Sequence, residues 1–312
     1  MPNSNNVDPA ALARIEASQR SMEQGGLPLN AIDRLRDQAA RQGTSKHIFT
    51  SDLSVNELLL ARTAGCEPLG QVMGSSVFHI GYQWQNAYFS GQGQEMDVLT
   101  RAHYSVRHLA LSRMQQEAAL LGASGVVGVR LEQRSYEWGG SLLEFAAIGT
   151  AIREVNSPPS KKVPFLSDLS GQEFMALRQA GYEPAGFCLG NCTYFQIGSW
   201  STQSATGNNG FWGTGFVNQE LTDFTQALYF SRELAMTRME HEARQASAGG
   251  IVGVKVEMDA RPVELGDENN RRIAMMFHFT AIGTAIKPYA DLHNPLQVVP
   301  VLSLKDDEGG IS

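Results

Sequence analysis

Cysteine is scarce in this chain of 312 residues, which contains only Cys66, Cys188 and Cys192. An odd number of cysteines in a chain this long argues against a small secreted domain held by disulfides and favours free thiols in a reducing compartment. The first ten residues are polar and lack the basic and apolar runs of a secretory signal. We therefore expect a cytoplasmic protein.

Long apolar runs and an excess of basic residues are also missing. No segment approaches the roughly 18 consecutive apolar residues that indicate a membrane-spanning helix, so we expect no membrane partner. The formal net charge is −7, whereas non-specific nucleic-acid binding depends on a basic surface, so we expect no nucleic-acid partner. The apolar content of 42% is that of a folded globular protein with room for two domains.

Recognisable catalytic motifs are a third absence. The chain contains neither the Gly-x-Ser-x-Gly pattern of a nucleophile elbow nor the His-Glu-x-x-His pattern of a zinc protease. Acidic residues do recur at equivalent places, Glu132 with Glu257 and Asp52 with Asp168. This recurrence fits a role in the fold or in an interface at least as well as catalysis. We therefore predict no catalytic residues and a protein that is not an enzyme.

What the chain does contain is an internal repeat. Five segments return in the same order, 49–54 as 165–170, 64–70 as 180–186, 110–118 as 235–243, 125–129 as 250–254, and 147–152 as 281–286. The offset between matching segments grows from 116 to 125 and then to 134 residues, and each increase falls where a loop is expected. Five ordered matches are not an accident of composition, so we predict two copies of one unit.

Each copy begins with the same short elements. A short helix opens after a Ser-Asp pair and ends at Gly65 or Gly181, because glycine readily takes the left-handed conformation after a helix. A strand pair follows, and Gly74 and Gly190 predict a bulge or turn within it. These strand pairs are expected at about 69–82 and 185–199.

A long amphipathic helix and two further strands complete each copy. The helix carries apolar residues every three or four positions, at about 99–121 and 224–243. Arg113 and Glu117 lie one turn apart on it, as do Arg238 and Glu242, and each pair is interpreted as a surface ion pair. The closing strands are expected at 126–132 with 141–153, and at 251–258 with 272–287.

These patterns divide the chain into five parts. Residues 1–48 form a helical N-terminal arm, with helices at about 9–23 and 29–42 separated by Gly25-Gly26. The arm's thin apolar stripe favours docking on its own assembly, on a neighbouring chain or on a separate partner. The remaining parts are repeat 1 at 49–154, a Pro-containing linker at 155–164, repeat 2 at 165–288 and a flexible tail at 289–312.

The order of these motifs resembles the YbjQ-like family, which is also labelled a heavy-metal-binding domain family. After the long helix the first copy reads Gly122-Ala-Ser-Gly-Val-Val-Gly-Val and closes on Gly149-Thr-Ala. The second copy repeats this with Ala248-Gly-Gly-Ile-Val-Gly-Val and Gly283-Thr-Ala. The glycines of this repeat signature are Gly125, Gly128, Gly149, Gly250, Gly253 and Gly283.

The resemblance implies an α+β fold, a tandem repeat of a small YbjQ-like or dodecin-like domain with an antiparallel sheet and one long helix. It also implies association into closed rings, pentameric in known members, and no established reaction. Family members usually carry a basic glycine-rich stretch before the long helix, which here reads Gly91-Gln-Gly-Gln-Glu in the first copy. A tandem arrangement also differs from single-domain members, so a two-layered ring is one option among others.

Metal binding is the alternative that the family label raises. Cys188 and Cys192, together with Cys66 and the nearby His79, are the available soft ligands. Residues four apart on a straight strand lie roughly 13 Å apart, too far to share a metal ion, although a tight turn at Gly190-Asn191 would bring them closer. Buried free cysteines remain the simpler interpretation. We expect no cofactor, or else a divalent or soft metal ion.

Two other groups of residues are weighed in the same way. His241 and His278 occur only in the second copy and are interpreted as polar surface residues rather than ligands. The glycine-rich loop 207–215 lacks the Gly-Lys-Ser/Thr ending of a phosphate-binding loop. Its aromatic residues instead predict an interface, and they are Phe211, Trp212 and Phe216.

The leading hypothesis from the sequence is a non-enzymatic homo-oligomer, a ring or shell-like scaffold that assembles with itself. A small domain with one helix and a few strands leaves sheet edges uncovered, and association of identical copies covers them. The N-terminal arm is a candidate contact for a protein partner. The second hypothesis is a protein that binds a metal ion or small ligand through thiols and histidines.

Overall fold

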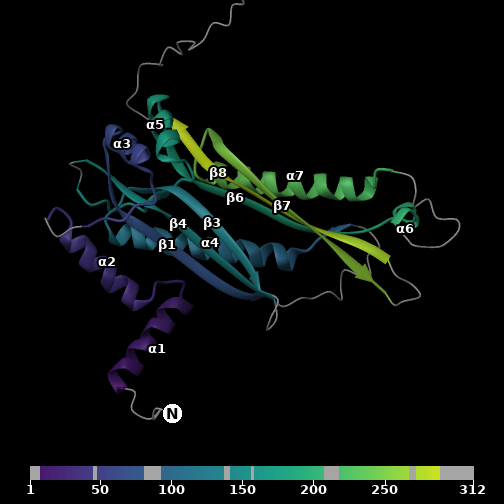
Figure 1. The fold of residues 1–312 in the computed structure, drawn as a ribbon, viewed down its shortest axis with the longest axis horizontal. Helices are drawn as coiled ribbons and strands as arrows, with labels where there is room; N and C mark the ends of the chain where they lie inside the picture. The colour runs from purple at the N-terminus through teal and green to yellow at the C-terminus, as the bar shows by residue number, and fades with distance from the viewer. Residues whose placement is uncertain are drawn as a thin grey trace, which may run out of the picture.

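The computed structural model describes residues 8–44, 48–80, 93–136, 141–155, 158–206, 218–266 and 272–288. The predicted C-terminal tail therefore lies outside the described residues. Two antiparallel sheets and two long helices make up most of the fold, which is α+β as the sequence predicts (Figure 1). None of the described helices is both long enough and apolar enough to cross a membrane.

The first sheet has the strand order β1-β4-β3-β5. β1 and β3 pair with β4 in antiparallel register, whereas the short β5 runs parallel to β3. The helix α4 (Asp97–Leu120) packs on this sheet, and α3 (Val55–Thr63) precedes it. The strands are β1 (Cys66–Ile80), β3 (Gly125–Tyr136), β4 (Ser141–Glu154) and β5 (Phe165–Leu166).

The second sheet has the order β2-β6-β8-β7, and all its neighbours are antiparallel. α7 (Thr222–Gln245) lies along it, as Figure 1 shows. α5 (Gly171–Gln179) precedes its long strands and α6 (Trp200–Thr206) follows β6. The strands are β2 (Gln94–Glu95), β6 (Tyr182–Ile197), β7 (Gly250–Leu265) and β8 (Arg272–Pro288). Thus β1-β4-β3 and β6-β8-β7 have the same order, each with a 24-residue helix.

The short helices begin where local chemistry favours them. Ser54 accepts a hydrogen bond from the backbone N–H of Glu57, whose carboxylate accepts the N–H of Ser54 in return. Ser170 and Glu173 form the same reciprocal capping box at the start of α5. The helices end, as predicted, at Gly65 and Gly181, which take positive φ values of 76° and 83°.

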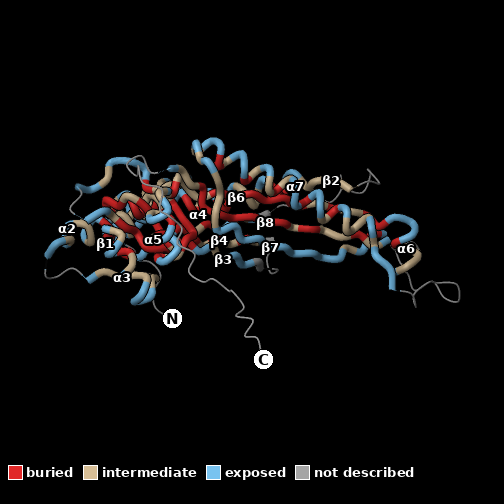
Figure 2. The backbone as a smooth tube through the Cα atoms, turned by 90° about the horizontal axis from the view of Figure 1, so that it is seen from above, coloured by how far each residue is buried: buried red, intermediate tan, exposed pale blue. Residues whose placement is uncertain are grey.

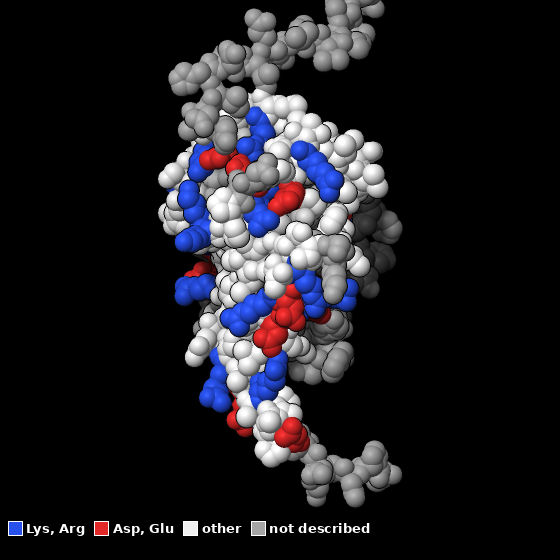
Figure 3. Space-filling model, turned by 90° about the vertical axis from the view of Figure 1, so that its left-hand side faces the viewer, with Lys and Arg blue, Asp and Glu red and all other residues white. Residues whose placement is uncertain are grey.

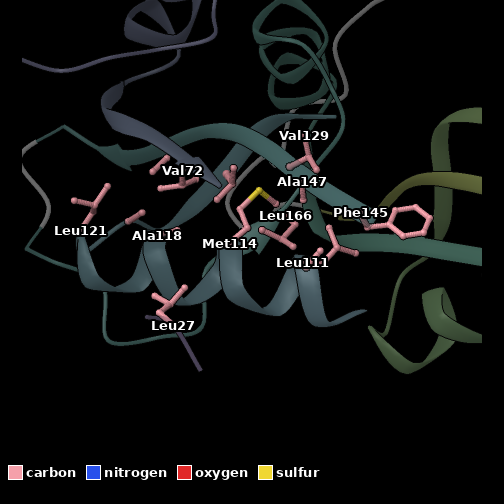
Figure 4. Close-up of a cluster of buried hydrophobic side chains, with 14 of the residues drawn as sticks. Leu27, Val72, Leu111, Met114, Ala118, Leu121, Val129, Phe145, Ala147 and Leu166 are labelled. Carbon is pink, nitrogen blue, oxygen red and sulfur yellow. The ribbon is translucent and has the colours of Figure 1, made fainter. Parts of the chain in front are cut away.

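The first core lies between α4 and the sheet that it covers. Met114 and Leu111 on α4 face Val72 and Ala147 on the strands (Figure 4). Burial is concentrated on the inner strands of both sheets, whereas β7 is exposed along most of its length (Figure 2). Apolar side chains at helical spacing on α4 and α7 thus meet apolar strands, as the sequence pattern predicts.

Gly74 and Gly190 do not form the bulge or turn that the sequence analysis expected. Both β1 and β6 pass through these residues as continuous strands. An added Cβ at Gly74 would lie 1.9 Å from the carbonyl oxygen of Ala110 in α4. At Gly190 it would lie 1.9 Å from the carbonyl oxygen of Ala235 in α7. Glycine is required here because each long helix touches the strand backbone, a contact that sequence spacing does not reveal.

The glycine signature forms a bulge in the same place in each sheet. Gly128 and Gly253 have φ values of 65° and 66°, and the register of β3 and β7 shifts at these residues. Opposite the bulge, a Cβ on Gly149 would lie 2.7 Å from Val126 Cγ1, and one on Gly283 would lie 2.8 Å from Ile251 Cγ2. The repeated glycines therefore shape the sheets.

The N-terminal arm folds back on its own chain. Its helices are α1 (Pro9–Glu23) and α2 (Leu29–Arg41), close to the predicted ranges. Leu27 and Leu35 are buried in the first core, and Figure 4 shows Leu27 against α4. Of the three docking surfaces considered for the arm, this structure therefore shows the one on its own chain.

Candidate functional site at the junction of the two sheets

The segment 165–170 connects the two sheets at the point where they meet. Its backbone extends the first sheet: the N–H of Ser167 donates to Val126 O over 2.9 Å, and Val129 N–H donates to Ser167 O over 3.0 Å. Gly128 N–H donates to Leu169 O over 2.8 Å. The segment thus covers the outer edge of β3, which would otherwise be an unpaired strand edge.

The same segment is fixed to the second sheet by its side chains. Thr284 on β8 accepts the N–H of Asp168 over 3.1 Å, and its hydroxyl donates to the Asp168 carboxylate over 2.6 Å. Lys255 on β7 lies 3.2 Å from the other oxygen of that carboxylate. In the first half, Asp52 makes the equivalent contacts with Thr150 and Arg130. The recurring aspartates therefore fix the segments 49–54 and 165–170, each to the sheet of its own half.

A second contact across the junction is made by β2. This strand precedes α4, yet it pairs with β6 of the second sheet. Glu95 on β2 forms a bidentate ion pair with Arg238 on α7, with N–O distances of 2.6 and 2.8 Å. Although burial works to raise it, the pKa of Glu95 is lowered by hydrogen bonds with Arg238 and Thr100. The pair fixes β2 on the second sheet.

α4 supplies the third contact. The hydroxyl of Tyr104 donates to Leu189 O over 2.5 Å and lies 2.7 Å from a carboxylate oxygen of Glu242. Asn191 on β6 donates to the carbonyl oxygen of Thr100 over 3.1 Å. α4 therefore packs on the first sheet and also contacts β6 of the second.

The expected surface ion pairs on the long helices are wrong. Arg113 and Glu117 are buried and do not pair with each other, because both bind the arm and β1. Arg113 donates to the carbonyl oxygens of Met22 and Gly26, while Glu117 binds Arg34 over 3.1 Å and accepts the Met73 N–H. Their counterparts in the second half, Arg238 and Glu242, likewise bind partners across the junction. Residues one turn apart are neighbours only when no stronger partner is present.

A buried polar cluster lies at the centre of the junction. Arg107 on α4, only 1% exposed, donates to Thr280 over 2.9 Å and to Gln133 over 3.1 Å. Burial lowers its pKa to about 10, so the guanidinium remains charged at neutral pH. The rings of His103 and His278 lie 4.1 Å apart beside it. Burial and the neighbouring Arg107 lower the pKa of His103 to about 3, so this imidazole stays neutral.

His278 is therefore not the surface residue that the sequence analysis expected. It lies against Arg107 and accepts or donates a 2.9 Å hydrogen bond with Thr193. Burial lowers its pKa well below the ordinary value. Sequence reasoning missed the cluster because its members come from distant segments. His241 is exposed, as expected, and contacts Gln245.

A cleft of about 210 Å³ opens where the capping boxes and the two aspartates meet. It is lined by Asp52, Glu57, Asp168 and Glu173 with Arg130 and Lys255. Each carboxylate there already has a hydrogen-bond or ionic partner. On the face in Figure 3, basic and acidic side chains lie interspersed in the same way. The junction thus holds two sheets together and offers no unpartnered carboxylate at this cleft.

Comparison with known proteins places the chain in a family. Residues 67–154 match the family model YbjQ_1, described as "Putative heavy-metal-binding". The UPF0145 protein of Clostridium perfringens is 35% identical over 88 residues, 28% of this chain and 81% of that protein. That of Thermotoga maritima is 35% identical over 89 residues, 28% of this chain and 82% of that protein. The chain belongs to the YbjQ (UPF0145) family.

A second similarity extends over about two thirds of the chain. The Encapsulin nanocompartment protein Rv1762c of Mycobacterium tuberculosis is 44% identical over 214 residues, which cover 66% of this chain and 76% of that protein. No solved structure matches the chain.

The family's heavy-metal description directs attention to the three cysteines. Cys66 packs with Val127 and Phe174, whereas Cys188 and Cys192 lie in the second core. β6 remains a strand between Cys188 and Cys192, so the structure lacks the turn that was considered to bring them together. Among the described residues, no group of three or more His, Cys, Asp and Glu side chains is arranged to hold a metal ion.

The pKa values of the Cys188 and Cys192 thiols also disfavour metal binding. Burial, followed by the nearby Glu242, raises the pKa of Cys188 to about 11. Burial and the nearby Glu95 raise that of Cys192 to about 12. A metal ion takes the thiolate, so both cysteines are held in the form that binds metals poorly. The predicted aromatic interface of Phe211, Trp212 and Phe216 lies outside the described residues.

Proposed function

We propose that this protein is a non-enzymatic scaffold whose chains assemble with one another through tandem YbjQ-like domains. The observation that carries the proposal is the exposed outer strand β7. Val254, Val256 and Met258 are 42%, 50% and 54% exposed on this strand, which pairs only with β8 among the described strands. An edge strand that leaves these apolar side chains exposed favours a contact with another chain.

The relative named an encapsulin nanocompartment protein supports an assembling role, because its similarity covers 66% of this chain and is therefore longer than one domain. The matching strand orders and 24-residue helices of the two halves support tandem copies of one dodecin-like unit, at 49–154 and 165–288. Edge pairing between copies favours a closed ring, and the resemblance to the YbjQ-like family adds a pentamer as the specific expectation. The arm's exposed Leu12 and Ile15 offer a contact for a further protein partner.

Native mass spectrometry of the full chain, purified without chelators, tests this proposal because one spectrum gives both subunit number and bound mass. The expected result is an oligomer of bare chains with one defined number of subunits. A monodisperse monomer at micromolar concentration contradicts the proposal. A monomer that carries a constant extra mass replaces it with the metal-binding or ligand-binding alternative.

A further inference from the structure

The second half exposes the surface that the first half buries at the junction. Val129 on β3 is 1% exposed and lies in the first core together with Leu166 of the segment 165–170. Its counterpart on β7 is Val254, which is 42% exposed. Among the described strands, none lies beside β7 in the place that β5 takes beside β3. In the described part of the second sheet, the edge of β7 is thus uncovered, whereas the equivalent edge of β3 is covered.

Gly250 identifies what that edge lacks. In the first half, the ring of Phe165 covers Gly125 so closely that an added Cβ would lie 2.2 Å from it. A side chain at Gly125 would therefore require the Phe165 ring to move. Gly250 occupies the equivalent place on β7, yet the nearest atom to its added Cβ is Ile286 Cγ1 at 3.8 Å. The space that a phenylalanine ring fills in the first half is open in the second.

The chain carries the matching segment at its other end. Residues 48–54, here called the opening segment, have the same order as 164–170 and place Phe49 where the later segment has Phe165. Thr150 fixes Asp52 to its own sheet as Thr284 fixes Asp168. The outward side of the opening segment remains uncovered, since Ile48 is 86% exposed and Thr50 is also exposed.

We propose that the opening segment of a second copy of this chain pairs with β7, so that the contact between chains repeats the junction within each chain. Phe49 of the second copy covers Gly250. Its Ser51 N–H donates to Ile251 O, and its Leu53 O accepts the N–H of Gly253. The contact is head-to-tail, and it closes into a ring or continues as a filament according to the rotation between copies. This inference rests on the proposed self-assembly and names its surface.

The N-terminal arm covers a second part of the proposed contact surface, on α4 of the first half. On the second half, Arg238 binds Glu95 and Glu242 binds Tyr104, both from the first half. On the first half, the equivalent Arg113 and Glu117 bind the arm. The arm therefore takes the place of a neighbouring copy. The counterpart of Glu95 is Glu220, which is exposed and available to replace the arm at Arg113 of the next chain.

One position makes the two contacts unequal. Gly171 at the start of α5 lies so close to α3 that an added Cβ would be 2.7 Å from Glu57 Cβ. Its counterpart is Val55 at the start of α3, directly after the opening segment, and Val55 has a larger side chain. The two helices must therefore stand further apart between chains than they do within one. The strand contact at Gly250 does not depend on this spacing.

Disulfide trapping in the full chain tests the register. Within the chain, Val126 and Leu166 are paired residues of β3 and β5, and their counterparts are Ile251 and Thr50. Neighbouring strands bring such Cα atoms to about 5 Å, within disulfide range. The double variant Thr50→Cys, Ile251→Cys is expected to form chain-to-chain disulfides under mild oxidation. The control pair, Thr50→Cys with Met258→Cys, moves one thiol roughly 23 Å along β7 and is expected to remain uncrosslinked.

Filling the open space tests the same contact without a cysteine. Gly250→Val places a side chain where Phe49 of the next copy would lie, while the free chain has room for it. The expected result is a loss of about tenfold or more in association affinity, measured by sedimentation, at an unchanged circular dichroism spectrum. Gly249→Ser is the matched control, because its counterpart Ser124 already has that side chain within the junction.

The outcomes separate the two proposals. Two results together support the inference. The Thr50→Cys, Ile251→Cys variant forms chain-to-chain disulfides while the Thr50→Cys, Met258→Cys variant does not, and Gly250→Val weakens association while Gly249→Ser does not. An oligomeric wild type whose Gly250→Val variant assembles equally well, and whose Thr50→Cys, Ile251→Cys variant forms no chain-to-chain disulfide, overturns the inference and leaves self-assembly standing. A wild-type monomer at micromolar concentration overturns the proposed function and the inference together.

Discussion

Glycine decides several of the contacts in this protein at the scale of single residues. Gly74 and Gly190 let α4 and α7 touch the strand backbone, and Gly128 and Gly253 form the two bulges. A side chain is excluded in the first case by distance and disfavoured in the second by positive φ. The glycine positions therefore have different physical causes, and their substitutions are expected to differ.

Gly190→Ala is expected to destabilise the chain by about 1–3 kcal/mol, because the new methyl group overlaps the Ala235 carbonyl and forces α7 away from β6. Gly186→Ala on the same strand is the control. Its added Cβ meets no atom within 4 Å, so the change is expected to be neutral or slightly stabilising. Urea unfolding of both variants measures the difference. Equal effects on the free energy of unfolding would contradict the close approach.

The half-buried His103 predicts destabilisation of the folded chain in acid. The pKa of His103 is about 3 in the folded chain, because of burial and then Arg107, and about 6.5 in the unfolded chain. Between these values the unfolded chain binds the additional proton, so the free energy of unfolding falls as the pH falls from about 6.5 towards 3. The slope per group is at most about 1.4 kcal/mol per pH unit.

Urea unfolding between pH 7 and pH 5 measures this slope. His103→Gln is expected to make the dependence on pH shallower, because the unfolded chain of the variant lacks that proton. His241→Gln is the control, since His241 is exposed on α7. An unchanged slope in His103→Gln would show that His103 is not held neutral in the folded chain.

The arm and the opening segment show how elements compete at the scale of secondary structure. α2 is fixed by Leu35, which is fully buried, and by Arg34, which binds Glu117. Side-chain amides add to this docking: Gln38 donates to Leu69 O and Gln42 donates to Leu121 O. An element that occupies a neighbour's place weakens association by the free energy of its own docking.

Leu35→Ala is therefore expected to loosen the arm and to strengthen association between chains. The lost apolar contact weakens docking by about 2–5 kcal/mol. Hydrogen exchange of α2 should rise, and sedimentation should show assembly at lower chain concentration. Leu12→Ala on the exposed side of α1 is the control, because Leu12 is 47% exposed. Faster exchange without stronger association would show that the arm does not compete with a neighbouring copy.

At the scale of the whole molecule, the two sheets form one continuous unit with unequal ends. Backbone pairing of 165–170 with β3, the Glu95–Arg238 pair and the packing of α4 against β6 join them. Because the head and the tail of this unit are complementary, association stabilises the folded state by mass action.

The melting temperature of the wild type is accordingly expected to rise with chain concentration, by about 2 °C for each tenfold increase. The melting temperature of Gly250→Val should begin to rise only at chain concentrations about tenfold or more higher, because this variant associates more weakly. Scanning fluorimetry over a hundredfold range of concentration measures both. A concentration-independent melting temperature of an oligomeric wild type would show that association does not contribute to its thermal stability.

The local sequence predicted the elements and their order with small errors at the boundaries. Apolar spacing located α4 and α7, glycines ended α3 and α5, and the arm helices lie where they were expected. The repeated segments also predicted similar local structure, and the strand orders β1-β4-β3 and β6-β8-β7 agree with that prediction. These features depend on neighbours within a few positions along the chain, and for that reason they can be read from it.

The tertiary structure alone decided which residues meet. Arg113 and Glu117 bind the arm instead of each other, the half-buried His278 lies beside Arg107, and Gly190 contacts α7 rather than forming a turn. Such contacts join segments tens to hundreds of residues apart, and one chain's spacing carries no record of them. The sequence by itself determined the order of the local elements, because each depends on neighbours along the chain. Packing determined that the segment 165–170 covers the edge of β3 and that, among the described residues, no strand covers the edge of β7.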